Sequence, residues 1–313
     1  MKKDYTDHLG RIHSGEILLS KDGFEVMNCE TCGFVHITPY NTEEDQKTFY
    51  QEGFYQEQKS GYIESHTRDK EWWTVQYNEK LDFFEKHLIA KNSRLLDIGS
   101  GPGYFLDASK SRGWECVGIE PGGPAYQFST EILGLKVVND FFDKNSYDKL
   151  GKFDVIHLNN VLEHINDPIE MINLAYEILN PGGILCVSSP NDFNPIQKIL
   201  VDRLKKDHWW VVPRHHVNYF SFESLERTLV KSGLSILKRS SSFPLEIFAL
   251  MGFDYIGNNE LGAKVHGMRK LLDESIHTSS CPHVLGDLYR VLAEIGIGRE
   301  ITIFSKKSLV EHL

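Results

Sequence analysis

The sequence predicts an α/β protein built on a doubly wound, mostly parallel sheet of seven strands. From residue 94 onward, short apolar segments alternate with longer segments of helical periodicity. The first apolar segment, RLLDIG, runs directly into glycines at alternate positions. Strands that alternate with helices imply right-handed crossovers, which make the strands parallel and cover both faces of the sheet. A chain of 313 residues is long enough for one large domain of this kind with smaller additions.

Each expected strand is a short apolar segment bounded by glycine or polar residues. The seven segments are 94–99, 115–120, 136–140, 153–160, 183–190, 235–241 and 300–307. The region between the last two, at about 245–298, is mostly helical in pattern and reads as an insertion before the final strand. Insertions at the ligand edge of an open sheet often shape a substrate pocket. We therefore expect a main domain over residues 91–313.

The first 90 residues have a different pattern. Three strand-like segments, GEILLS, FEVMNC and GFVHITP, are separated by glycine and polar residues, which predicts a small β-rich module over residues 1–45. A polar stretch rich in aromatic residues follows and has helical character, so residues 46–90 are expected to form a helical linker or lid.

The composition excludes several classes of function. The net charge is −10 without a clustered Lys/Arg stripe, which argues against nucleic acid as a partner. The sequence contains no apolar run long enough for a membrane helix, and the first lysines are not followed by the apolar core of a secretory signal. Five scattered cysteines do not make a disulfide framework. We expect a cytoplasmic protein that acts on a small molecule.

The stretch RLLDIGSGPGYF, residues 94–105, indicates a ligand that approaches the backbone closely where glycines carry no side chain, next to an acidic residue. A phosphate-binding P-loop would need a Lys-Ser/Thr pair after the last glycine, and Gly103 is followed by Tyr104 and Phe105. The dinucleotide fingerprint would place its third glycine at position 104. Asp97 would repel a pyrophosphate but attract the ammonium group of an amino-acid ligand, which favours S-adenosylmethionine (SAM).

Further acids and polar residues follow the next strands. Glu120 ends the second strand and could accept hydrogen bonds from both ribose hydroxyls, in NAD as well as in SAM. Asp140 closes the third strand, where it could accept from an adenine amino group with Phe141 against the ring; the alternative is that it caps a helix. The residues expected to line the mouth of the sheet after the fourth strand are Asn159, Asn160 and Val161.

Together these pieces resemble the class I SAM-dependent methyltransferases. LLDIGSGPGYF, VGIEP, NDFF, FDVIHLNNVLEHINDP and LNPGGILCVSSPN occur in the order and with the spacings usual in that family, and REITIFSKK resembles its final strand. The resemblance implies a Rossmann-like methyltransferase fold in which the glycine loop cradles the methionine part of SAM, the second-strand acid holds the ribose and the third-strand acid meets the adenine. By motif match these roles fall on Asp97, Gly99, Gly101, Glu120 and Asp140. The neighbouring residues complete the expected cofactor site: Ser100, Gly103, Tyr104, Phe105, Pro121, Phe141, Asn159, Asn160 and Val161. Gly103 could serve helix–strand packing instead.

The candidate catalytic residues are histidines. DHWWVVPRHHVNYFSFESL resembles a segment common in this branch of methyltransferases, and His216 occupies the matching histidine. A histidine can take a proton near neutral pH, as methyl transfer to a sugar hydroxyl would require, or it can fix a loop over the pocket. His215 is a weaker candidate, and His164, beside Glu163, could either line the active site or belong to a helix end.

A possible metal site lies in the N-terminal module. Cys29 and Cys32 form a Cys-x-x-Cys knuckle, a spacing that can hold a zinc ion from one side. The module resembles the zinc ribbon that opens many methyltransferases of this branch, but the upstream cysteine pair is missing. His8 and His13 stand roughly in its place and could complete the set. The alternative is a metal-free remnant held by packing.

Three hypotheses about function follow. The first is a SAM-dependent methyltransferase that acts on a small molecule, with O-methylation of a carbohydrate or a nucleotide-sugar or polysaccharide precursor as the leading reaction. The second is an NAD-dependent oxidoreductase on a similar sheet, and the third is a SAM-binding protein without turnover. The sequence does not set the oligomeric state.

Overall fold

The computed structural model describes residues 2–42, 61–88 and 93–309. Its larger sheet has seven strands in the order β11-β12-β9-β8-β5-β6-β7. All neighbours are parallel except β12, which runs antiparallel to both β9 and β11. The strands are β5 (Arg94–Ile98), β6 (Glu115–Ile119), β7 (Val137–Val138), β8 (Phe153–Asn159), β9 (Leu179–Pro190), β11 (Leu234–Ser240) and β12 (Glu300–Lys307). The predicted α/β class with seven mostly parallel strands is confirmed.

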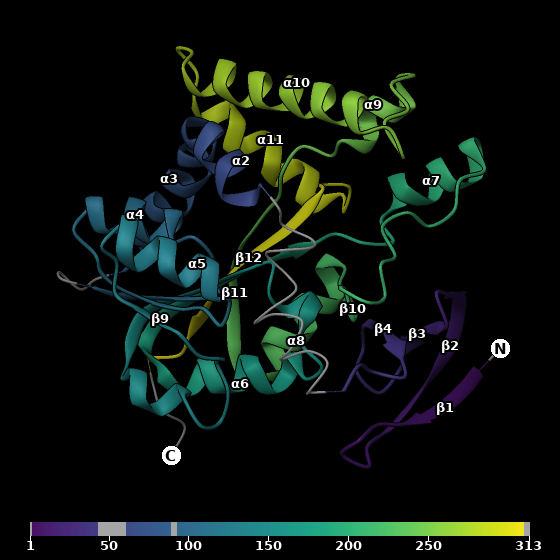
Figure 1. The fold of residues 1–313 in the computed structure, drawn as a ribbon, viewed down its shortest axis with the longest axis horizontal. Coiled ribbons are helices and arrows are strands. Elements are labelled where there is room, and N and C mark those ends of the chain that lie inside the picture. The colour runs from purple at the N-terminus through teal and green to yellow at the C-terminus, as the bar shows by residue number, and fades with distance from the viewer. Residues whose placement is uncertain (1, 43–60, 89–92, 310–313) are drawn as a thin grey trace.

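Helices cover both faces of this sheet (Figure 1). Consecutive residues of β5 point to opposite faces, as they must in a strand. Leu95 belongs to a buried cluster with Phe84 of the overlying helix, while Leu96 belongs to another with Ile172. The α-helices are α2 (Tyr62–Arg68), α3 (Lys70–His87), α4 (Tyr104–Ser111), α5 (Gly123–Gln127), α6 (Pro168–Ile178), α7 (Pro195–Leu204), α8 (Phe222–Lys231), α9 (Glu246–Leu250), α10 (Asn259–His277) and α11 (His283–Glu294). A π-helical turn, η2 (Phe128–Ile132), and the 3-10 turns η3 (Tyr147–Leu150) and η4 (Leu162–His164) complete the set.

The strand order reverses direction between β5 and β8, near the middle of the sheet. The chain proceeds from β5 to β6 and β7 on one side, then crosses back to form β8 on the other side of β5. The loops that follow β5 and β8 therefore diverge at the same edge, which is where open α/β sheets bind ligands. The glycine loop follows β5, and Asn160 follows β8.

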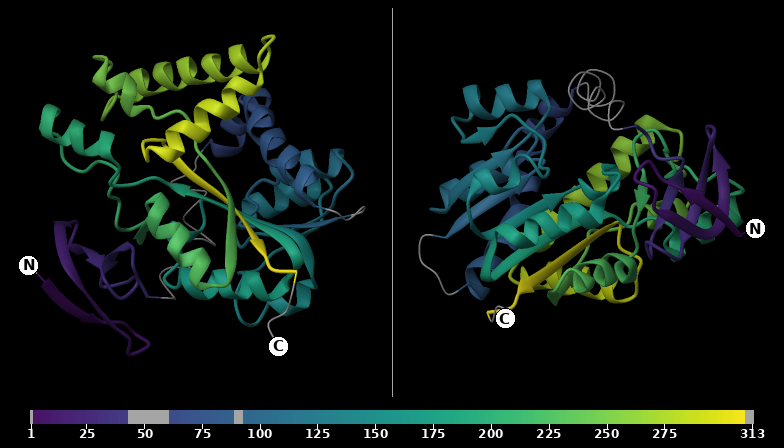
Figure 2. Two further views of the ribbon diagram at one scale, coloured as in Figure 1. Left: turned by 180° about the vertical axis from the view of Figure 1, so that it is seen from behind. Right: turned by 90° about the horizontal axis from the view of Figure 1, so that it is seen from below.

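The N-terminal module is a second, antiparallel sheet with the order β1-β2-β3-β4-β10. Its strands are β1 (Lys2–Thr6), β2 (Ile12–Lys21), β3 (Phe24–Cys29), β4 (Val35–Thr38) and β10 (Asn218–Tyr219). The last of these comes from the main domain and pairs with β4, and the backbone N–H of Ile37 donates to Val217 O at 3.0 Å. The module lies at the end of the molecule away from α4 and α5 (Figure 2). Shared strand pairing thus joins it to the main domain.

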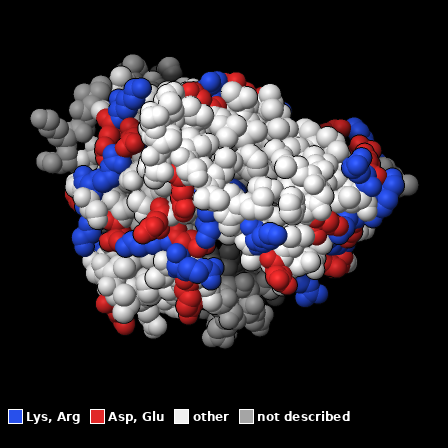
Figure 3. Space-filling model, turned by 90° about the horizontal axis from the view of Figure 1, so that it is seen from above, with Lys and Arg blue, Asp and Glu red and all other residues white. Residues whose placement is uncertain are grey.

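The segment between β11 and β12 contains α9, α10 and α11, which lie above the rest of the molecule in Figure 1. Helix α10 packs against α3, where Trp72 Nε1 donates to the buried Asp273 Oδ2 at 2.8 Å. Residues 46–60 of the expected linker lie outside the described residues. In the part that is described, no helix has the length and apolarity to span a membrane. The face seen from above carries acidic and basic side chains interspersed, without one basic patch (Figure 3).

Candidate functional site

The glycine loop between β5 and α4 has a backbone that only glycine adopts easily. Gly99, Gly101 and Gly103 have φ values of +68°, +52° and +85°. A Cβ on Gly99 would lie 2.7 Å from Val161 Cγ2, and one on Gly103 would lie 2.6 Å from Leu135 Cδ1. Gly103 therefore serves close packing of the loop on its neighbours. Gly99 allows the loop after β5 to touch the loop after β8.

Replacing Gly99 with alanine is expected to destabilise the fold by about 2–3 kcal/mol. The left-handed backbone costs roughly 1–2 kcal/mol for an L-residue, and the new methyl must displace Val161. Gly134 is the matched control because its φ is +61° and nothing lies within 4 Å of its Cβ position. Urea unfolding of the two variants should show the larger loss for Gly99→Ala. Equal losses would mean that the contact with Val161 does not matter.

Glu120 ties the glycine loop to the end of β6. Its side chain is buried, with Oε2 accepting from Gly101 N–H at 2.9 Å and Oε1 accepting from Gly122 N–H at 2.8 Å. The carboxylate therefore lies at the loop, where the sequence placed it. Each carboxylate oxygen has a second lone pair, so Glu120 can accept further hydrogen bonds from a ligand.

Asp97 lies in a buried network beneath the loop. Its Oδ1 is 2.7 Å from His157 Nδ1, and Lys80 Nζ of α3 is 3.0 Å from His157 Nε2. Burial, and then the charge of Lys80, lowers the pKa of His157, which favours a neutral ring that donates to Asp97. Lys80 also donates to Asn159 Oδ1 at 3.0 Å and to Ser188 Oγ at 3.2 Å. Asp97 was expected to face the ammonium of a ligand, but this oxygen is held by a histidine.

His157 and Lys80 were not among the residues predicted from the sequence. Asp97 and His157 are directly paired residues of the parallel strands β5 and β8, so their contact depends on strand register. Lys80 reaches the same network from a helix that precedes both strands. A buried polar residue at the same position of two adjacent strands was the only available signal.

Two aromatic residues after the glycines pack inside the protein. The hydroxyl of Tyr104 is 2.5 Å from Thr67 Oγ1 of α2, and Phe105 lies against the His157 ring with centroids 4.1 Å apart. Both side chains are buried. Ser100 is also buried, and its Oγ has no hydrogen-bond partner among the described residues. Of these three expected cofactor residues, only Ser100 has a buried polar atom that lacks a hydrogen-bond partner among the described residues.

The residues after β6 and β7 form the outer edge of the site. Asp140 is exposed and its Oδ1 accepts from the N–H of Phe141, which is half-buried. No α-helix begins at this point, so Asp140 does not cap one. Asn139 Nδ2 donates to Glu120 O at 2.8 Å and holds this edge against the end of β6, beside the half-buried Pro121.

The chain leaves β8 through Asn159, Asn160 and Val161 and reaches the wall of a pocket. Asn160 has a positive φ of +56°, and its Oδ1 is buried without a hydrogen-bond partner among the described residues. Asparagine tolerates this left-handed conformation better than most residues, and non-glycine residues held in it cluster at functional sites. The cavity that Asn160 lines has a volume of about 510 Å³, and we call it the β8–β9 pocket.

Buried acids line much of the β8–β9 pocket. Glu163, Asp192 and Glu246 are 1%, 6% and 3% exposed, and Oε1, Oδ2 and Oε2 respectively have no hydrogen-bond partner within the described part of the chain. Burial raises the pKa of Glu163 to about 8 and that of Asp192 to about 7. Arg299 Nη1, 3.5 Å from Glu246 Oε1, supplies a positive charge. These acids can receive the donors of a polar ligand.

All three predicted catalytic histidines line this pocket. His164 Nδ1 is 2.7 Å from His215 O, so that nitrogen carries the proton and donates it. The rings of His164 and His216 lie edge to face with centroids 5.0 Å apart. Burial, and then the charge of Arg214, lowers the pKa of His215. The structure brings His164 next to His215 and His216, which lie more than 50 positions later in the sequence, and it adds Asp192 and Glu246, which the sequence did not group with them.

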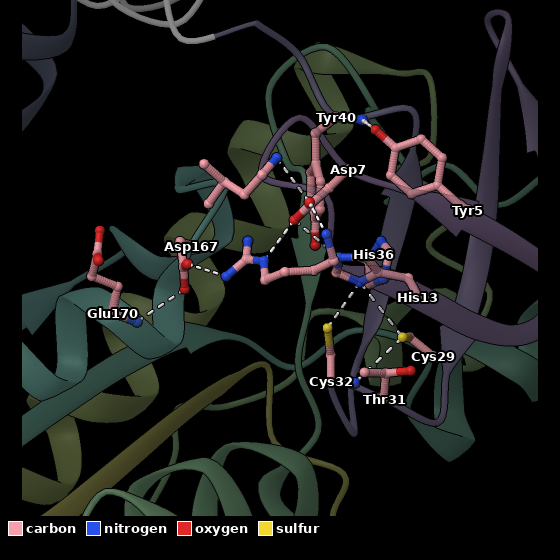
Figure 4. Close-up of polar contacts among 12 residues, drawn as sticks. Tyr5, Asp7, His13, Cys29, Thr31, Cys32, His36, Tyr40, Asp167 and Glu170 are labelled. Atoms are coloured by element: carbon pink, nitrogen blue, oxygen red, sulfur yellow. Dashed lines mark hydrogen bonds and ion pairs between the residues drawn. The ribbon is translucent and has the colours of Figure 1, made fainter.

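A separate cluster of two histidines and two cysteines lies in the N-terminal module (Figure 4). One ligand atom from each of His13, Cys29, Cys32 and His36 lies within 4.8 Å of the others. His13 Nδ1 is 3.2 Å from Cys32 Sγ and 3.8 Å from Cys29 Sγ. A hydrogen bond from Cys32, with others from His13 and His36, lowers the pKa of the Cys29 thiol. His8, which was expected in this set, is exposed in a turn and lies outside the cluster; His36 takes its place.

Both histidines of the cluster are held from behind. His13 Nε2 is 3.2 Å from Asp7 Oδ2, and His36 Nδ1 is 2.8 Å from Ile37 O. Burial would raise the pKa of Asp7, but hydrogen bonds from Arg11 keep it well below its usual range. An acceptor behind each imidazole favours a proton on the outer nitrogen, so that the lone pair of the inner nitrogen faces the other members of the cluster, the arrangement found around metal-bound histidines.

Comparisons with known proteins agree with this architecture. A family model for the methyltransferase domain matches residues 67–239, more than half of the chain. An uncharacterized methyltransferase of Mycobacterium sp. (strain KMS) is 35% identical over 101 residues, 30% of this chain and 37% of that protein. A ubiquinone biosynthesis O-methyltransferase of Hahella chejuensis (strain KCTC 2396) is 27% identical over 135 residues, 38% of this chain and 56% of that protein.

The matched segments span about a third to just over half of these curated relatives. Among solved structures, a SAM-dependent methyltransferase from Archaeoglobus fulgidus superposes with a TM-score of 0.51 at 18% identity, covering 79% of this chain and 99% of that one. This likeness supports the fold, and the family match decides between the SAM and NAD hypotheses. The chain belongs to the methyltransferase-domain family, and its fold is that of the class I SAM-dependent methyltransferases.

Proposed function

We propose that this protein transfers the methyl group of SAM to a hydroxyl group of a small, sugar-like acceptor bound in the β8–β9 pocket. The observation that carries the proposal is the set of buried polar atoms in that pocket with no hydrogen-bond partner among the described residues. Asp192 Oδ2 and Glu246 Oε2 can accept from hydroxyls, and Trp210 Nε1 can donate to one. A buried polar atom left unsatisfied costs about 1–3 kcal/mol, so a ligand with several hydroxyls would gain from satisfying them.

The residues around the glycine loop suit SAM. Bound SAM supplies a methyl group already activated on a sulfonium, so the protein mainly has to position it. Glu120 would hold the ribose, and Asp140 with Phe141 would meet the adenine. Ser100 Oγ and Asn160 Oδ1, both buried with no partner among the described residues, offer further hydrogen bonds. Asp97, through its bond to His157, would position the loop.

A hydroxyl acceptor must lose its proton when it is methylated. His216, His164 and His215 line the pocket, and a histidine near neutral pH can take such a proton. His216 is our first candidate for activating the acceptor. Trp209 also lines the pocket and gives the apolar face of a sugar ring a surface to stack on.

The proposal predicts methyl uptake by hydroxylated acceptors and a selective effect of Asp192→Asn. Nucleotide sugars would be screened with methyl-labelled SAM, and the product would be analysed by mass spectrometry. For the best acceptor, Asp192→Asn should raise KM at least about 10-fold, because a hydrogen bond to a charged group contributes about 1.5–3 kcal/mol. The affinity for S-adenosylhomocysteine should not change.

Asp148→Asn, at an exposed acid on η3, is the matched control. It should leave both constants unchanged. Uptake by amines alone would contradict the proposal of a hydroxyl acceptor. An unchanged KM in Asp192→Asn would place the acceptor elsewhere.

We also infer that the N-terminal module holds a structural zinc ion through His13, Cys29, Cys32 and His36. Two thiolates and two imidazoles are a usual set of four zinc ligands. The fit rests on the closeness of the four side chains and on the acceptors behind both histidines.

A further inference from the structure

A second group of potential metal ligands lies in the wall of the β8–β9 pocket. One ligand atom from each of Glu163, His164 and His216 lies within 4.8 Å of the others. Glu163 and His164 belong to η4, whereas His216 comes from the loop before β10. The group is separate from the cysteines of the N-terminal module and faces the cavity rather than the protein core.

Backbone contacts fix these two segments against each other. Val217 N–H donates to Glu163 O at 2.7 Å, which sets His216 beside η4. The Nδ2 group of the buried Asn218 donates to Leu162 O at 2.9 Å and to Ile165 O at 2.6 Å, so one side chain spans the whole 3-10 turn. The cluster is therefore built by the fold and does not depend on flexible surface side chains.

The polar atoms of the cluster present acceptors to one another. Glu163 Oε2 accepts from Ser189 Oγ at 3.1 Å, but Oε1 is buried with no hydrogen-bond partner among the described residues. Because His164 Nδ1 donates to His215 O, its Nε2 carries a lone pair, and this atom is 3.9 Å from Glu163 Oε1. When its carboxyl group is ionised, Glu163 presents an acceptor to this lone pair, and a cation between the two atoms would compensate both.

We propose that Glu163, His164 and His216 bind a divalent first-row metal cation such as Mn²⁺ in the β8–β9 pocket. One carboxylate and two imidazoles that leave other positions open are a ligand set for metals of this class. An ammonium group would suit the carboxylate, but the two imidazoles beside it favour a metal. The open positions would face the cavity of about 510 Å³.

The cation gives this pocket a specific role, which rests on the proposed function. It would bind the acceptor hydroxyl oxygen and lower the pKa of that hydroxyl, so that the proton leaves to solvent. The oxygen then forms a bond to the methyl carbon while the bond from that carbon to sulfur breaks, which gives the methyl ether and S-adenosylhomocysteine. His216 would then act as a metal ligand and not as the base.

The test is a titration of the whole protein chain with Mn²⁺ alone. Electron paramagnetic resonance measures the concentration of free Mn²⁺ at each step. Wild type should bind one Mn²⁺ per chain. The variant Glu163→Gln should bind this ion at least about 10-fold more weakly. Asp192→Asn is the matched control because it also removes a buried pocket carboxylate but lies outside the cluster. It should keep the Mn²⁺ affinity of wild type within about twofold. Thermal unfolding of each variant checks that it is folded.

The outcomes separate this inference from the proposed function. Absence of Mn²⁺ binding, or equal binding by wild type and Glu163→Gln, would overturn the metal site, even if hydroxyl methylation proceeds in the presence of a chelator. A loss of binding in Asp192→Asn as large as that in Glu163→Gln would also overturn it, because the ion would then be held by general acidity. Selective loss in Glu163→Gln supports the site, even if no sugar is found to accept a methyl group.

Discussion

Replacement of Glu120 with alanine is expected to weaken the binding of S-adenosylhomocysteine about 100-fold. A buried carboxylate that accepts from the ribose contributes about 1.5–3 kcal/mol for each such hydrogen bond, and 1.4 kcal/mol corresponds to tenfold in affinity. The same substitution leaves the N–H groups of Gly101 and Gly122 without their present acceptor, so the loop is also less well held. Isothermal titration calorimetry measures the change directly.

Two further variants serve as controls for the effect of Glu120→Ala on ligand affinity. Glu131→Ala removes an exposed acid of η2 and should bind the ligand as wild type does. Glu120→Gln keeps the size and one acceptor oxygen, so its affinity should lie between those of wild type and Glu120→Ala. Wild-type affinity in a folded Glu120→Ala protein would show that the ribose is held by another residue.

The double substitution Cys29→Ser/Cys32→Ser is expected to remove zinc from the protein. Wild type should contain about one zinc ion per chain by elemental analysis, and the variant less than about a tenth. Structural zinc sites bind with apparent free energies of about 10–16 kcal/mol, so the N-terminal sheet should also unfold at a lower temperature. Because β4 pairs with β10 and Ile37 contacts Val217, the pocket should lose part of its support while S-adenosylhomocysteine affinity is retained.

Single histidine variants test which ligands complete the site. His36→Ala should lose zinc, whereas His8→Ala should keep it, because His36 lies in the cluster and His8 does not. Cys281→Ser, at an exposed cysteine outside the cluster, is the control for the loss of a thiol. Zinc retained by the double cysteine variant, or lost in His8→Ala but not in His36→Ala, would contradict the proposed ligand set.

The fold could be predicted from the sequence because its signals are local. Each strand of the large sheet is a short apolar segment next to a glycine or polar boundary, and all seven predicted segments correspond to strands. The glycines of the loop were identified because a positive φ depends on the residue itself. Strand β1 was missed because it is polar and exposed at a sheet edge, and β10 was missed because two residues are too few to show an alternation.

The sequence by itself determined the order of strands and helices, the glycine loop and the acids at the ends of the strands. Only the tertiary structure decided which of these residues meet. It paired Asp97 with His157, put His36 in the place expected for His8, and joined Glu163 to His216. The reason is physical: backbone conformation follows from neighbouring residues, whereas contacts between distant residues depend on strand register and on how helices pack over the sheet. A cluster of ligands or acids assembled from several elements therefore leaves no spacing in the sequence by which it can be recognised.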